Sequence, residues 1–213
     1  GLVDFVSPSC YWDTVTYLPF ESFLEMAKGT DCRILGCTSE QVGPGGHSRP
    51  PKAALRAGAL NAWKQGVDGI YLFNFHHQTI AKMDDREVLS QLGDPATLEF
   101  RDKLYAETPA RGAVSSWPSA PFYEGSDHQL PLTLEENSVE TIRFLVSDDL
   151  ETAGRRGILD AVTLELILVS VTSEDAFEFK LNGKALPQTV PLDVPLNYTV
   201  GPGPSPFHGN YAL

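Results

Sequence analysis

The first half of the chain alternates short apolar runs with stretches that have the pattern of amphipathic helices. Apolar runs occupy residues 2–7, 33–38 and 69–75. The stretches PFESFLEMAKG and PPKAALRAGALNAWKQG lie between them and carry apolar residues at helical spacing. Gly29 and Gly66 stand where these helices are expected to end. Strands and helices in this alternation predict βαβ units with a parallel sheet.

The third run, in GVDGIYLFNFHHQ, predicts a buried strand with a polar exit. Its continuous apolar character is typical of a parallel strand covered on both faces. Side chains alternate along a strand, so Tyr71, Phe73 and Phe75 are expected on one face, and Leu72, Asn74 and His76 on the other. Two helices are predicted next, the second with Asp94 before it and Pro95 in its first turn.

The pattern changes after about residue 108. Residues 108–125 are rich in Pro, Ser and Gly and predict a linker. Beyond them, runs such as AVTLELILVSV are rich in β-branched residues, and Asn182-Gly183 is a strong signal for a two-residue hairpin turn. Residues 126–213 are therefore expected to form an antiparallel β-sandwich, which the end of the sequence truncates if a closing strand is missing.

Charge and composition exclude some classes of function. Acidic residues outnumber basic ones 28 to 16, whereas binding to a nucleic-acid backbone depends on Lys and Arg, so no nucleic acid is expected as partner. No apolar run reaches the roughly 20 residues that span a bilayer, so no membrane partner is expected. The three cysteines lack the spacing of a zinc site, and the adjacent histidines His76 and His77 have no carboxylate nearby. We expect no metal and no cofactor.

The stretches GLVDFVSPSCYWDT, ALNAWKQGVDGIYLFNF and LGDPATLEFRDKLY, followed by a β module with FEFKLNG, resemble glycoside-hydrolase-like proteins. In those proteins a (β/α)8 barrel precedes a β-sandwich. The resemblance implies an α/β plus all-β fold, in which residues 1–107 are the last three βα units of the barrel, 108–125 a linker and 126–213 the sandwich. It also implies carbohydrate as the partner.

Three strands cannot close a barrel. Two explanations are open: the sequence is the C-terminal part of a longer protein, which we favour, or a partner supplies the other strands. In either case we expect the edge formed by residues 2–7 to pair with a second copy or with an N-terminal barrel segment. Uncovered strands are also expected to expose apolar side chains such as Ile70, Leu72 and Phe73.

In such barrels the chemistry lies at the C-terminal ends of the strands. The candidate catalytic carboxylates are Glu40, after the second strand, and Asp13, after the first; a second carboxylate on strands absent from this sequence is the alternative to Asp13. The candidate sugar-binding residues follow the same three strands: Tyr11, Trp12, His47, Asn74 and His76. Aromatic rings suit the C–H face of a sugar, and amides, imidazoles and carboxylates suit its hydroxyls.

Each of these residues also has a purely structural interpretation. Tyr11 and Trp12 could anchor a loop, Asp13 could cap a turn, Glu40 and His47 could be solvated, and Asn74 could hold a neighbouring loop. The leading functional prediction is hydrolysis of glycosidic bonds by a carboxylate pair. The alternative is a non-catalytic, lectin-like sugar-binding protein. The sequon Asn197-Tyr198-Thr199 slightly favours a secreted location, which the sequence otherwise leaves unknown.

Overall fold

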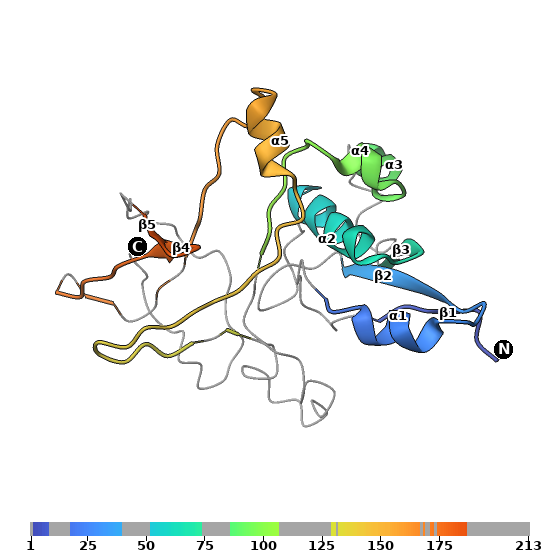
Figure 1. Cartoon of the computed structure of the whole chain (residues 1–213), viewed down its shortest axis with the longest axis horizontal. Helices are drawn as coiled ribbons and strands as arrows, with labels where there is room; N and C mark the ends of the chain where they lie inside the picture. The colour runs from blue at the N-terminus through green and yellow to red at the C-terminus, as the bar shows by residue number, and fades with distance from the viewer. Residues whose placement is uncertain are drawn as a thin grey trace. The chain divides into compact units, whose positions relative to one another are not determined.

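The computed structural model describes residues 2–8, 18–39, 52–73, 86–106, 129–130, 132–166, 168, 171–172 and 174–186. The chain divides into two compact units, residues 1–160 and residues 161–213. Figure 1 shows the α/β elements of the first unit and the hairpin of the second.

A parallel sheet of three strands forms the centre of the first unit. The strands are β1 (Phe5–Val6), β2 (Arg33–Ser39) and β3 (Gly69–Phe73), in the order β1-β2-β3. Val6 pairs with Ile34, and the β2–β3 ladder runs from Leu35 opposite Gly69 to Ser39 opposite Phe73. The three predicted strands and their parallel pairing are thus present. The closed barrel of the resemblance stays a prediction.

Asp68 joins the entrances of β2 and β3. Its carboxylate Oδ2 accepts a hydrogen bond from the Ile34 backbone N–H at 2.8 Å, and its own N–H donates to the Ile34 carbonyl at 2.8 Å. Both bonds are made to the backbone of Ile34, so a shift of β3 by one residue along β2 would break both. Asp68 therefore helps to set the register that determines where β2 and β3 end.

The described helices begin and end close to where the sequence predicts. They are α1 (Glu21–Ala27), α2 (Lys52–Gln65), α3 (Arg86–Leu92), α4 (Pro95–Leu98) and α5 (Leu150–Arg155). Gly29 and Gly66 have φ angles of 75° and 98°, which glycine adopts without strain where a helix stops. The Asp94 carboxylate accepts a bond from the Ala96 N–H at the start of α4. Only α5 lacks a counterpart in the sequence predictions.

Helix α2 packs against the sheet and contributes to both parts of the core. One buried cluster joins α2 to α3 and α4, and the other joins α2 to α1 and β2. The members of the first are Leu55, Ala59, Leu60, Val88, Leu92 and Leu98, and those of the second are Phe20, Ile34, Ala62 and Val67. Helix α2 lies close to β2 because small residues meet where they touch. A Cβ added to Gly36 of β2 would lie 2.6 Å from the Cβ of Ala62 on α2.

The two faces of the sheet differ in exposure, which corrects two sequence predictions. Ile70 and Leu72 were expected to be exposed, but both are partly buried against the α2 cluster because they lie on the helix-covered face. Strand β3 was expected to be covered on both faces, but Tyr71, on the opposite face, is 41% exposed. At the outer edge, Leu2, Val3 and Phe5 are exposed. Pairing of this edge with another strand stays a prediction.

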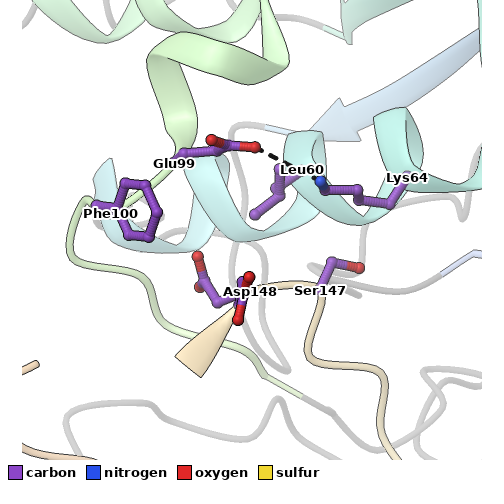
Figure 2. Close-up of a pocket in the computed structure, with 7 residues that line it drawn as sticks. Leu60, Lys64, Glu99, Phe100, Ser147 and Asp148 are labelled. Atoms are coloured by element: carbon purple, nitrogen blue, oxygen red, sulfur yellow. Dashed lines mark ion pairs between the residues drawn. The ribbon is translucent and has the colours of Figure 1, made fainter. Parts of the chain in front are cut away.

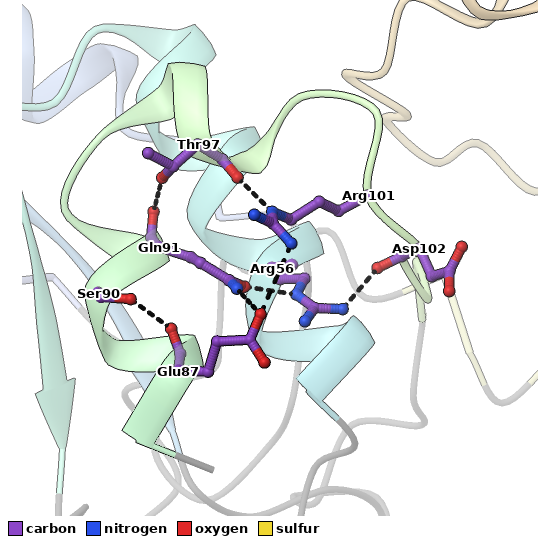
Figure 3. A network of polar contacts seen from close by, with 7 residues as sticks. All are labelled: Arg56, Glu87, Ser90, Gln91, Thr97, Arg101 and Asp102. Atoms are coloured by element: carbon purple, nitrogen blue, oxygen red, sulfur yellow. Dashed lines mark hydrogen bonds and ion pairs between the residues drawn. The ribbon is translucent and has the colours of Figure 1, made fainter. Parts of the chain in front are cut away.

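A polar network fastens α3 and the segment after α4 to α2 (Figure 3). Arg56 on α2 donates from Nε to the Gln91 side chain at 2.9 Å and from Nη1 to the Asp102 carbonyl at 3.4 Å. The Gln91 amide in turn donates to Glu87 at 2.8 Å, and Arg101 lies 3.7 Å from the same carboxylate. Gln91 is 3% exposed, so this network satisfies a buried polar side chain.

The described part of the second unit contains an antiparallel hairpin, β4 (Lys180–Leu181) and β5 (Lys184–Ala185). Asn182 and Gly183 have φ angles of 49° and 78°. Positive φ at both turn residues is the requirement of a type I′ turn, so the Asn-Gly signal predicted this hairpin for the right reason. A β-sandwich stays a prediction, and the predicted linker at 108–125 lies outside the described residues.

Replacing Gly36 by alanine tests the close packing of α2 on the sheet. Because the added methyl group would lie 2.6 Å from the Ala62 Cβ, α2 must move away from β2. We expect Gly36→Ala to lower the free energy of unfolding by about 1–3 kcal/mol, measured by urea denaturation. Gly93→Ala is the matched control, since its added Cβ meets no atom within 4 Å. Equal stability of the two variants would contradict this packing.

Candidate functional site

The C-terminal ends of the three strands lie along one edge of the sheet, because the strands are parallel. Strands β2 and β3 end at the same level, with Ser39 paired to Phe73. Strand β1 ends earlier, at Val6, and the next residue still contacts the sheet: the Ser7 hydroxyl donates to the Leu35 carbonyl at 3.3 Å. The chain therefore leaves the sheet along the same edge after each of the three described strands.

All the site residues that the sequence predicts lie outside the described residues. These are Tyr11, Trp12, Asp13, Glu40, His47, Asn74 and His76. The structure does describe the strand ends from which they follow. It thus fixes where three segments of chain leave the sheet, and the side-chain geometry of the predicted site stays a prediction.

Two of these residues follow the described strands directly in the sequence. Glu40 comes next after Ser39, and Asn74 comes next after Phe73, the last pair of the β2–β3 ladder. Asp13 comes seven residues after Val6, the last residue of β1.

A shallow pocket lies elsewhere in the first unit, between α2, the segment after α4 and the start of α5 (Figure 2). It holds about 370 Å³, part of which is open solvent. Its lining residues are Leu60, Lys64, Glu99, Phe100, Ser147, Asp148 and Asp149. Three carboxylates around a small pocket raise the question of acid–base chemistry.

Each of these carboxylates already has a structural partner. Glu99 lies 3.6 Å from the Lys64 ammonium, both being about half exposed. Asp149 accepts a hydrogen bond from the Thr152 N–H at 2.9 Å and caps α5, and this bond holds the pKa of the Asp149 carboxyl below its usual range. Asp148 is paired with Lys103 at 2.7 Å. The pocket therefore does not offer a pair of unengaged carboxylates.

Lys103, Asp148 and Tyr105 form a partly buried cluster, which we call the latch. Lys103 Nζ donates to Asp148 Oδ1 at 2.7 Å, and the Tyr105 hydroxyl donates to Asp148 Oδ2 at 2.9 Å. The Lys103 side chain is 2% exposed and that of Asp148 is 16% exposed. Burial, with the nearby Asp148 charge and its hydrogen bond, raises the pKa of Tyr105 far above its usual value. Each oxygen of the Asp148 carboxylate thus has a donor.

Sequence reasoning missed the latch. Asp149 is the N-cap of α5, and Asp148 is a partly buried ion-pair partner of Lys103. The sequence did contain a capping signal, since Asp149 precedes a helix-compatible LETAGR stretch. No local sequence signal predicts the ion pair between Asp148 and Lys103, because 45 positions separate the two residues.

Three further findings bear on function. Among the described residues, no group of three His, Cys, Asp or Glu side chains could hold a metal ion. None of the helices in this part of the chain is long and apolar enough to cross a membrane. The chain matches no protein-family model and no curated protein. The resemblance to glycoside-hydrolase-like proteins therefore still depends on the sequence stretches that suggested it.

The raised pKa of Tyr105 predicts a specific alkaline instability. A pKa raised by folding means that the stabilisation is complete below the unfolded value of about 10 and is lost as pH rises above it. At pH 7 we expect Tyr105→Phe to lower the free energy of unfolding by about 1–2 kcal/mol, through loss of a bond to a carboxylate.

This deficit should shrink as pH rises above about 10, because only the wild type then has a partly buried phenol at position 105 that must either ionise or stay protonated. Denaturant unfolding at several pH values measures both effects. Tyr71→Phe, at an exposed position on β3, is the control and should follow the wild type. A deficit that stays constant with pH would contradict the placement of Tyr105.

Proposed function

We propose that the protein acts on carbohydrate and that, in its complete form, it hydrolyses glycosidic bonds with a pair of carboxylates. Glu40 is one member of the pair, and Asp13 is the first choice for the other. Tyr11 and Trp12 stack on the sugar ring. His47, Asn74 and His76 bind its hydroxyl groups.

The observation that supports this proposal best is the register at the end of β2 and β3. Ser39 and Phe73 form the last pair of the ladder, and Glu40 and Asn74 are the next residues in the sequence after these two neighbouring strand ends. A carboxylate beside an amide can act on one sugar residue: the carboxylate takes part in proton transfer or attack, and the amide binds an adjacent hydroxyl. Strand β1 is parallel to β2, and the segment that carries Asp13 follows it in the sequence.

The chemistry requires that the two carboxyl groups act differently. One must be protonated to donate to the glycosidic oxygen, and the other must be ionised to attack the sugar or to activate water. Carboxyl groups about 5–5.5 Å apart support retention of configuration, and groups about 6.5–9.5 Å apart support inversion. Neighbouring parallel strands are about 4.8 Å apart. Carboxyl groups on adjacent strands, or on strands one further apart, can therefore reach the separations that support retention or inversion.

Substitution of Glu40 tests the proposed role. Glu40→Gln keeps the size of the side chain and removes its charge and its proton-transfer capacity. We expect turnover to fall by several orders of magnitude, roughly 10³-fold or more, while sugar binding and melting temperature stay near those of the wild type. Turnover is measured as released reducing ends over a panel of oligosaccharides, and binding on a glycan array. Glu25→Gln, an exposed glutamate on α1, is the matched control.

The outcomes separate the proposal from its alternatives. Sugar binding without turnover in the natural protein, whose intact mass shows whether it extends beyond this sequence, would favour the lectin-like alternative. Turnover that is unchanged in Glu40→Gln and lost in Asp13→Asn would transfer the principal role to Asp13. A natural protein that neither binds nor cleaves any sugar on the panel would contradict the proposal.

A further inference from the structure

Residues 141–157 form a segment that runs along the first unit and ends with α5; we call it the strap. The Asn61 side chain on α2 donates from Nδ2 to the Leu145 carbonyl at 3.1 Å. Asn61 is fully buried, so the strap covers a polar side chain of the central helix. The strap is thus bonded to the core of the unit before it reaches α5.

The latch holds the strap three residues further along. Asp148 belongs to the strap, whereas Lys103 and Tyr105 belong to the segment after α4. Lys103 Nζ also donates to the Arg101 carbonyl at 3.1 Å. A lysine ammonium that is almost completely buried must keep its countercharge, so separating Asp148 from it would be costly. The latch therefore resists movement of the strap away from the unit.

Helix α5 is also held at its far end. The Arg156 guanidinium lies 4.7 Å from the centre of the Phe100 ring, within the range of a cation–π contact, and Ala153 is 8% exposed. A helix of six residues is not stable alone in water. Its backbone hydrogen bonds, such as that from the Arg156 N–H to the Thr152 carbonyl at 3.0 Å, therefore report on whether α5 is docked.

These contacts end abruptly after α5. Gly157 has a φ of 66°, and the Ile158 N–H donates to the Ala153 carbonyl at 3.1 Å, which completes the end of the helix. Within the described part of the chain, no hydrogen bond involves residues 159–166. The division between the two compact units falls inside this stretch, after Asp160.

We propose that the latch and the strap make residues 141–157 a fixed part of the first unit, and that this unit ceases to hold the chain after Ile158. This inference goes beyond the proposed function and does not depend on it.

Amide hydrogen exchange of the full chain, read by mass spectrometry, tests the proposal without any substitution. We expect a step in protection: amides of residues 153 and 156–158 exchange at least tenfold more slowly than those of 159–166. Equal exchange on the two sides of Ile158 would overturn the proposal. If both sides exchange fast, the strap is not docked, and if both exchange slowly, the chain after Ile158 is held as firmly as the strap.

Substitution of Asp148 tests the latch itself. Asp148→Asn leaves the buried Lys103 ammonium without its countercharge, so exchange at residues 153 and 156–158 should rise at least tenfold while the amides of α2 stay protected. Asp31→Asn, at an exposed position, is the matched control and should change neither. Unchanged exchange in α5 would overturn the role of the latch.

If Asp148→Asn also speeds amide exchange in α2, the milder substitution Tyr105→Phe tests the role of the latch. It removes one hydrogen bond and keeps the ion pair, so a rise in exchange that is clearly larger in the strap than in α2 supports the latch. No rise in the strap, or an equal rise in α2, overturns it.

Discussion

The close contact between α2 and the parallel sheet is the constraint on which the rest of the first unit depends. Gly36 of β2 leaves room for Ala62 of α2, and a side chain at either position larger than the one present would separate helix from sheet. Leu55 and Leu60 of α2 pack in the buried cluster that joins this helix to α3 and α4. Two polar residues of α2 serve the same purpose: Arg56 binds the segment after α4, and Asn61 binds the strap.

The same contact matters for the proposed site, because it holds the sheet whose edge defines it. Asp68 fixes the start of the β2–β3 ladder, and the ladder ends at Ser39 and Phe73. A carboxylate and an amide that follow these residues can work together only if the register between the strands is rigid. The packing of α2 and the two hydrogen bonds of Asp68 supply that rigidity at a distance from the chemistry.

Local signals in the sequence predicted the local structure well. Gly29 and Gly66 end helices because they adopt positive φ, Asp94 caps α4, and Asn182-Gly183 turns a hairpin. Contacts between distant residues were not predictable in this way. The exposure of Tyr71 depends on which face the helices cover, and the latch joins Lys103 to Asp148 across 45 positions. For the candidate site, sequence supplied the residue types after each strand, and the structure supplied the alignment of two strand ends.

Photo-crosslinking tests directly whether sugar binds next to the ends of β2 and β3. The sugar that binds best on a glycan array is attached to a diazirine, crosslinked to the protein and located by mass spectrometry. We expect labels on the peptides that contain Glu40 and Asn74, reduced by competition with unlabelled sugar. Labels confined to the pocket around Lys64 and Phe100, or to residues 161–213, would contradict it.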